Sequence, residues 1–334
     1  MASYKEFHKR SIEDRDGFWG EQAQLIHWNK QPAQIYDFSN PPFVKWFVGG
    51  ETNLCYNAVD RHAETHPDRK ALVYISTETD EEKTYSFSEL RAEVMRMAAI
   101  YQSLGVKKGD RVLIYMPMIA EACFAMLACA RIGAIHSVVF GGFASHSLAT
   151  RIDDAKPTVI VSADAGMRGG RPVPYKHLLD EAINLAEHKP AKVLMVNRGL
   201  DKAMEVVAGR DEDYATLRAQ HLDAQVPVTW LESSDPSYIL YTSGTTGKPK
   251  GVQRDTGGYA VALAASMKHI YCGNAGETFF STSDIGWVVG HSYIIYGPLI
   301  AGMATVMYEG TPLRPDAGIW WKICQEQEVT VMFS

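Results

Sequence analysis

The chain has 334 residues, of which 46% are hydrophobic and 22% charged, with 33 Lys and Arg against 39 Asp and Glu and a formal net charge of −6. At ~150 residues per domain this length corresponds to about two domain-sized units, enough to bury a large core without a metal or disulfide. The composition excludes collagen, coiled-coil, disordered and disulfide-scaffold classes, and a mildly acidic chain is a poor candidate for binding nucleic acid.

Helix signals appear from residue 53 onward. Asn53 is a good N-cap for a helix with the apolar face Leu54, Ala58, Val59 and Ala63. The capping-box pattern Ser86-x-x-Glu89 predicts the start of a second helix, which ends before Gly105. Two more helices are predicted over Ile119–Ile132 and Lys176–His188.

Short apolar, β-branched runs alternate with these helices and predict strands. The runs are Ala71–Ser76, Val112–Met116, Ile135–Phe140, Thr158–Ser162, Lys192–Val196, Tyr238–Tyr241 and Met303–Tyr308. Because these runs lack polar alternation, we expect mostly parallel sheets covered by helices on both faces, in an α/β fold.

The last seven residues, Glu328–Ser334, begin as a buried strand, and the sequence then stops. A strand of this kind would leave apolar faces and a sheet edge uncovered. The pattern therefore predicts that the sequence stops inside a domain, and the alternative is a natural C-terminal edge strand.

Five scattered cysteines without a C-x-x-C pair favour a reducing compartment. The N-terminus lacks the apolar segment of a signal peptide and carries acidic residues that a transit peptide avoids. The longest uncharged apolar stretch, Gly297–Met307, is too short to span a bilayer of ~20 helical residues. We expect a cytoplasmic protein without a membrane or nucleic-acid partner.

The segment Tyr241-Thr-Ser-Gly-Thr-Thr-Gly-Lys-Pro-Lys-Gly251 follows a predicted strand directly. Its glycines allow close backbone approach to an anion, and its hydroxyls and lysines add donors and positive charge, so phosphate is the expected ligand. It is not a Walker A loop, because Gly244 and Gly247 are too close and Pro249 follows Lys248. The alternative is a mobile loop rich in Gly, Ser and Thr.

This loop resembles the signature of the adenylate-forming superfamily, which includes acyl-CoA synthetases, adenylation domains and luciferases. Ala130–Phe143 and Asp284–Tyr293 resemble the short-chain acetyl-CoA synthetase branch, and Gly251–Tyr259 with Phe143–Ser147 resembles its propionate-activating members. The resemblance covers essentially the whole chain. It implies stacked, mostly parallel sheets, a branch-specific extension over 1–52, and an AMP-binding domain over 53–334 that is incomplete at its C-terminus.

The resemblance also implies a two-step reaction. A carboxylate attacks the α-phosphate of ATP, which carries Mg²⁺, and CoA then displaces AMP from the acyl-adenylate. Joining two anions requires cations and oriented dipoles at the site. The residues that match the phosphate-holding loop are Thr242, Ser243, Gly244, Thr245, Thr246, Gly247, Lys248 and Lys250. Propionate is the expected acid, and acetate is the alternative.

Arg168 and Arg171 match the paired arginines that hold the phosphates of the CoA nucleotide, a task that suits the forked donors of guanidinium. Spacing alone would describe a solvated pair, so the resemblance carries this assignment. Gly142 matches a glycine against which CoA packs. The family's acetate enzymes have Thr at position 289 and Asn at position 313, where this chain has Val289 and Leu313, so the match is broken at those two contacts.

The resemblance implies an acyl pocket at Trp287, Val288, Val289 and Gly290. A short-chain acid needs a small apolar slot with a bulky end, and one methylene changes binding by ~1–3 kcal/mol. Ordinary core packing is the competing interpretation of these residues. His291 is expected to be a structural histidine without a role in proton transfer.

The family's adenine and ribose contacts, its Mg²⁺-binding glutamate and its adenylation lysine all match positions beyond Ser334. We therefore predict no catalytic residue and no metal ligand within these 334 residues, and expect a mobile C-terminal domain as a partner in cis. The chain alone is expected to be inactive. The competing hypothesis of another class is a non-catalytic protein that binds nucleotide or CoA.

Two other patterns are predicted to be structural. His62 and His66 have helical spacing, but Glu64 stands one place late for a zinc-protease motif, which favours an exposed helix end. Asp153 and Asp154 are expected to lie on a solvated surface.

Overall fold

A computed structural model describes residues 3–242 and 249–334 of the chain. Its larger sheet contains β6 (Arg111–Tyr115), β7 (Ile135–Val138), β8 (Val159–Ala163), β11 (Lys192–Val196), β12 (Asp211–Asp213), β14 (Pro236–Thr242) and β15 (Lys250–Asp255). The strand order is β12-β11-β8-β6-β7-β14-β15. Every neighbouring pair is parallel except β14–β15, which places one antiparallel strand at the edge.

The second sheet contains β4 (Lys70–Ser76), β5 (Glu81–Ser86), β16 (Thr278–Ser281), β17 (Ala304–Glu309) and β18 (Val329–Phe333). Its order is β18-β16-β17-β4-β5, and only the β4–β5 edge pair is antiparallel. The predicted α/β fold with mostly parallel sheets is therefore confirmed.

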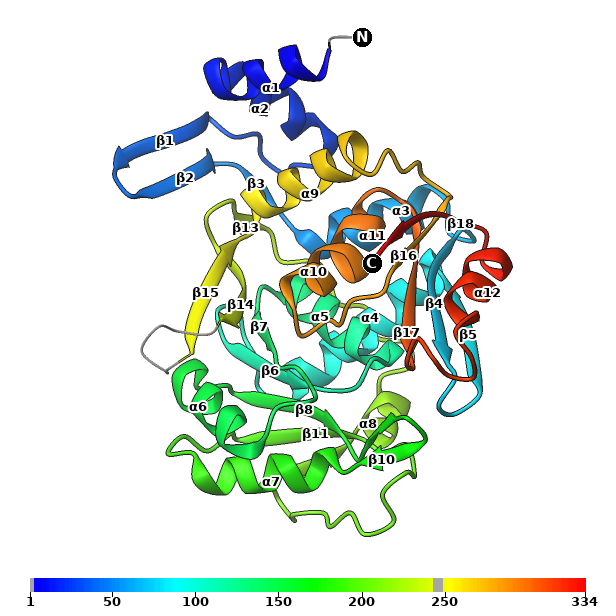
Figure 1. The fold of residues 1–334 in the computed structure, drawn as a ribbon. Helices are drawn as coiled ribbons and strands as arrows, with labels where there is room; N and C mark the ends of the chain where they lie inside the picture. Colours follow the sequence, from blue (N-terminus) through cyan, green and yellow to red (C-terminus); the bar gives the residue numbers. More distant parts are fainter. Residues whose placement is uncertain (1–2, 243–248) are drawn as a thin grey trace.

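Helices cover both faces of each sheet (Figure 1). They are α1 (Tyr4–Glu13), α2 (Arg15–Gln22), α3 (Arg61–Thr65), α4 (Phe87–Ser103), α5 (Ala120–Ile132), α6 (Ser145–Ala155), α7 (Tyr175–Leu185), α8 (Tyr214–Gln220), α9 (Gly257–His269), α10 (Val288–Gly290), α11 (Gly297–Ile300) and α12 (Ile319–Glu326). Single turns of 3₁₀ helix (Ala23–Leu25) and π-helix (Tyr56–Asp60, His291–Tyr296) join some of them.

Side-chain alternation along the strands divides the core into layers. On β6, Val112 and Ile114 join the main core with α4 and α5, between the two sheets. Leu113 and Tyr115 point the other way and pack with α6 and α7 on the outer face. On the second sheet α12 packs against the outer face of β4 through Val73. Both faces of each strand are apolar because both are buried.

The N-terminal residues pack against this body, and Ile26, Trp28 and Phe47 are buried in the main core. The antiparallel hairpin β1 (Gln34–Asn40) and β2 (Phe43–Val48) projects from the body at the upper left of Figure 1. The strand β3 (Glu51–Thr52) pairs with β13 (Leu231–Glu232). In the described part of the chain, the helices are too short or too polar to cross a membrane.

The sequence located most of the central elements. All seven predicted strands and the strand within Glu328–Ser334 are present, with ends shifted by at most two residues. The Asn53 side chain accepts the N–H of Tyr56 at 3.0 Å, and the Ser86 capping box is formed. The prediction that His62 and His66 lie at an exposed helix end was wrong for His62. This side chain is half-buried, and burial lowers its pKa to about 4.

An ion pair joins the two sheets. Arg198, two residues beyond β11, donates to both carboxylate oxygens of Glu309 at 2.7 Å. Glu309 ends β17 and also accepts from the hydroxyls of Tyr74 (2.9 Å) and Ser76 (2.8 Å) on β4. Its carboxylate is 4% exposed, so the charge is buried with its partners.

We predict that Arg198→Met destabilises the chain by about 3–5 kcal/mol, because it leaves the Glu309 carboxylate buried without its cation. Glu309→Gln alone is also destabilising, but the double variant costs less than the sum of the two, since the charges are removed together. Urea unfolding of all four proteins measures this. Strict additivity would contradict a coupled pair.

Candidate functional site

A cavity with a volume of about 700 Å³ lies where the two sheets meet. Its lining comes from segments that follow parallel strands: Pro117 and Met118 after β6, Phe140–Ala144 after β7, Gly166–Arg168 after β8, Ser281–Asp284 after β16, and Tyr308–Pro312 around the end of β17. Ligands of open α/β sheets bind outside the carboxyl ends of the strands. The cavity occupies such a place in both sheets at once.

The predicted phosphate loop connects β14 to β15 at the same edge of the larger sheet. Its first residue, Thr242, pairs with Lys250 across the two strands, and both side chains are exposed. The other predicted loop residues, Ser243, Gly244, Thr245, Thr246, Gly247 and Lys248, lie outside the described residues.

Three side chains of β14 and α6 form the base of this loop. The Tyr241 hydroxyl donates to Asp154 Oδ2 at 2.6 Å. The Arg151 guanidinium lies 4.4 Å from the ring centroid of Phe143 and 5.5 Å from that of Tyr241. Arg151 therefore connects the turn after β7 with the start of the predicted phosphate loop by cation–π contact.

The sequence prediction that Asp153 and Asp154 lie on a solvated surface is confirmed for Asp154, which is exposed, whereas Asp153 is half-buried. Both carboxylates also have partners, because Asp153 accepts the N–H of His188 at 2.8 Å and Asp154 accepts the hydroxyl of Tyr241 at 2.6 Å. The sequence offered no signal for these partners, which lie 35 and 87 residues away.

The predicted CoA-binding arginines lie opposite each other on a hairpin, β9 (Gly166–Arg168) and β10 (Arg171–Val173). Both side chains are exposed, and Arg168 lines the cavity. Gly142 lines it as well, and a side chain there would collide with the Phe140 ring. The structure thus brings Gly142 and Arg168 to one cavity, with Arg171 across the hairpin.

The predicted acyl-pocket residues separate in the structure. Trp287 lines the cavity, 47% exposed, with its ring centroid 5.5 Å from that of Phe140. Val288 and Val289 lie outside the cavity lining, at the start of α10. Gly290 is buried, and a Cβ there would collide with the backbone of Asp284. Trp287 is therefore the residue of this set that contacts the cavity.

Sequence reasoning assigned no role to Asp284 or Glu309, although both line the cavity. Burial raises the pKa of Asp284, and nearby Arg168 opposes the rise. Its carboxylate accepts the N–H of Gly286 at 2.7 Å, which shapes the turn before Trp287. The available signal was its place at the head of the Asp284–Tyr293 motif.

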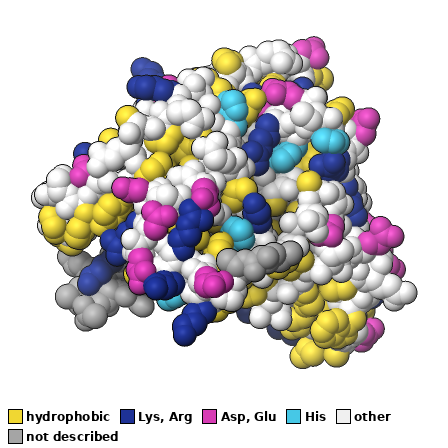
Figure 2. Space-filling view, turned by 90° about the horizontal axis from the view of Figure 1, so that it is seen from above, with side chains coloured by type: hydrophobic (Ala, Val, Ile, Leu, Met, Phe, Trp, Pro, Cys, Tyr) yellow, Lys and Arg dark blue, Asp and Glu magenta, His cyan; other side chains and the backbone are white. Residues whose placement is uncertain are grey.

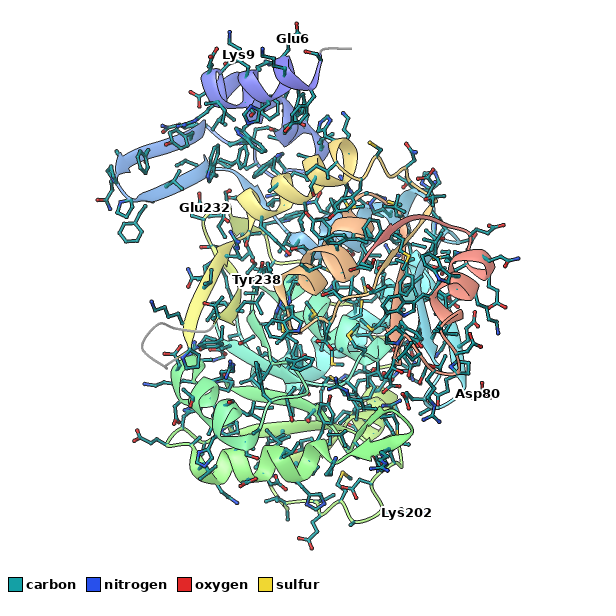
Figure 3. The ribbon with its side chains drawn as sticks, in the orientation of Figure 1. Glu6, Lys9, Asp80, Lys202, Glu232 and Tyr238 are labelled. Carbon is teal, nitrogen blue, oxygen red and sulfur yellow. The ribbon has the colours of Figure 1, made fainter. Side chains whose placement is uncertain are left out.

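His291 lies in a buried aromatic cluster beside β14. Its ring centroid is 4.8 Å from that of Tyr238, a residue of β14 that is labelled in Figure 3, and 5.3 Å from that of His136. Burial lowers the pKa of His291 to about 4 and the pKa of His136 well below its usual value. Both rings are therefore neutral at pH 7 and act here in packing.

Family profiles match almost the whole chain. The profile described as "Acetyl-coenzyme A synthetase N-terminus" matches residues 4–58, and the profile described as "AMP-binding enzyme" matches residues 59–334. The chain belongs to the AMP-binding enzyme family. The resemblance inferred from the loop and the Asp284–Tyr293 motif is thereby confirmed.

Curated members of the AMP-binding enzyme family include close relatives. The chain is 64% identical to "Propionate--CoA ligase" of Salmonella typhimurium and 62% identical to that of Escherichia coli, each over 99% of this chain and 53% of the relative. It is 48% identical to human "Acyl-CoA synthetase short-chain family member 3, mitochondrial", over 100% of this chain and 48% of the relative. The chain thus spans about half the length of these relatives.

We predict that stability falls on acidification between pH 6.5 and about 4, partly because His291 must stay neutral in the folded state. Over this window the unfolded chain binds the proton and the folded chain does not, so stability rises with pH. The His291 contribution is roughly 3 kcal/mol across the window.

Urea unfolding across this pH range measures the effect. His291→Gln flattens the dependence, and His66→Gln, at an exposed helix end, is the matched control. An equal slope in wild type and His291→Gln would contradict the assignment.

Proposed function

We propose that the chain is the substrate-binding part of an ATP-dependent short-chain acid–CoA ligase. The proposed overall reaction forms propionyl-CoA from propionate, ATP and CoA through a propionyl-adenylate, and releases AMP and pyrophosphate. The observation that carries this proposal is one cavity lined by Gly142, Arg168 and Trp287, whose lining residue Phe143 is connected through Arg151 to Tyr241 at the end of β14. The names of the two bacterial relatives support propionate as the acid.

The proposed roles follow the chemistry of each group. The segment from Thr242 to Lys250 holds the β- and γ-phosphates of ATP, because backbone N–H groups, hydroxyls and lysines suit phosphate oxygens. Arg168 and Arg171 hold the phosphates of the CoA nucleotide, and Gly142 allows CoA to pack against the backbone. Trp287 closes the acyl slot, with Val288, Val289 and Gly290 forming the turn behind it.

Adenylation joins the carboxylate of propionate to a triphosphate, so charge at the reacting phosphorus must be offset. Mg²⁺ would accompany ATP and supply part of that positive charge. Among the described residues, no three His, Cys, Asp or Glu side chains cluster as a metal site.

We further propose a boundary between Thr52 and Asn53, with residues 1–52 as an extension of the AMP-binding domain. The contact of α2 with α9 and the β3–β13 pair support an extension attached to the main body. Since the chain spans about half of its relatives, we propose that turnover also needs a further C-terminal domain.

A cytoplasmic location accords with the five cysteines, which are all free. Acidic and basic side chains are interspersed on the face shown in Figure 2, which agrees with small-molecule substrates rather than nucleic acid.

Acid-dependent exchange of ATP with labelled pyrophosphate tests the proposed function. Acetate, propionate and butyrate are offered to this chain and to the full natural product that contains it. We expect exchange only in the longer protein, strongest with propionate by about 10-fold, as one methylene can provide.

If exchange is strongest with acetate, the acid substrate is acetate instead of propionate, and the proposed type of reaction stands. Nucleotide or CoA binding without exchange in either protein would favour a non-catalytic binding protein. Exchange by the 334-residue chain would contradict the need for a further domain.

A further inference from the structure

Glu78 connects the smaller of the two main sheets with the arginine hairpin β9–β10, which forms a two-stranded sheet of its own after β8. It lies in the turn between β4 and β5, and its side chain is 0% exposed. Its two carboxylate oxygens accept the backbone N–H groups of Gly169 (2.8 Å) and Gly170 (2.6 Å). In Figure 1 the tip of the β9–β10 hairpin points toward the β4–β5 turn, which Asp80 marks in Figure 3.

The hairpin needs an external support. Its strands have three residues each, and an isolated two-stranded hairpin is marginally stable at best. Arg168 and Arg171 are direct cross-strand partners, and like charges in such positions repel. The two glycines between them have φ values of 62° and 76°, as a type I′ turn requires. Glu78 binds this turn at its two N–H groups.

Glu78 is itself held in place by contacts on two sides. The Ser76 hydroxyl accepts the N–H of Glu78 at 3.3 Å and donates to Glu309 at 2.8 Å, the carboxylate paired with Arg198. On the other side, Arg314 Nη1 lies 3.8 Å from Glu78 Oε2. The backbone of Glu78 is therefore linked through Ser76 to the buried ion pair of the sheets, and its carboxylate lies near a second cation.

We propose that Glu78 is a positioning residue for CoA: it fixes the Gly169–Gly170 turn so that Arg168 and Arg171 face the phosphates of the CoA nucleotide. This inference rests on the function proposed above. The bound phosphates would relieve the repulsion between the two arginines. Glu78 therefore holds the hairpin of the free protein in the geometry that the ligand then stabilises.

Charge and positioning give opposite expectations at this residue. A carboxylate near a phosphate site repels the ligand, so removing its charge alone would tighten binding. A positioning role predicts weaker binding instead, because the Gly169–Gly170 turn samples other conformations when Glu78 no longer accepts its N–H groups. Glu78→Ala removes both acceptors, and Glu78→Gln keeps one.

The test is calorimetric binding of CoA and of adenosine 3′,5′-bisphosphate to the full natural product. We expect Glu78→Ala to raise the Kd of both ligands about tenfold, equivalent to ~1.4 kcal/mol, with a smaller rise for Glu78→Gln. The Kd of ATP, measured with Mg²⁺, should stay unchanged in both variants. Glu81→Gln is the matched control, because Glu81 is an exposed carboxylate at the start of β5, in the same β4–β5 hairpin as Glu78.

The outcomes separate the two claims. If wild type binds CoA, Arg168→Met weakens binding and Glu78→Ala binds as well as or better than wild type, the inference on Glu78 is overturned alone. Equal loss of CoA and ATP binding would also overturn it, because it would indicate a general structural role. If wild type binds neither CoA nor the bisphosphate, the proposed function itself fails.

Discussion

The geometry of the cavity depends on one buried ion pair, Arg198 with Glu309. Arg198 follows a strand of the larger sheet and Glu309 ends a strand of the smaller one, with two hydrogen bonds of 2.7 Å between them. Burying these charges is costly unless every lone pair is satisfied. Tyr74 and Ser76 supply the remaining donors, so the pair fixes where the carboxyl ends of both sheets meet.

The site then follows from loops that leave those strand ends. Residues after β7, β8 and β16 reach one space, so a glycine turn, an arginine and a tryptophan from distant parts of the sequence line the same cavity. Arg151 and Tyr241 extend this set toward the β14–β15 connection. The proposed reaction between two anions and a thiol would suit such a place, since the backbone is held by two sheets while the lining residues differ in charge and size.

The sequence predicted the elements well where local patterns decide them. Lys192–Val196 is an apolar run that is buried on both faces, and the Ser86 capping box forms as its spacing requires. The long-range contacts could not be predicted from the sequence. Arg198 and Glu309 are 111 residues apart, and Glu78 is 91 residues from Gly169, whose N–H it accepts. Such pairs are set by tertiary packing, and propensity or periodicity contains no signal for them. The hydrogen bond from Tyr241 to Asp154 spans 87 residues and lacked a sequence signal for the same reason.

The most direct test of the account is a crystal structure of the chain with an alkyl ester of AMP that carries a three-carbon alkyl group. We predict that the propyl group lies against Trp287, inside the cavity that Gly142 and Arg168 also line, with the ester phosphate turned toward Thr242. A propyl group outside this cavity, or an adenylate bound away from the β14–β15 edge, would contradict it.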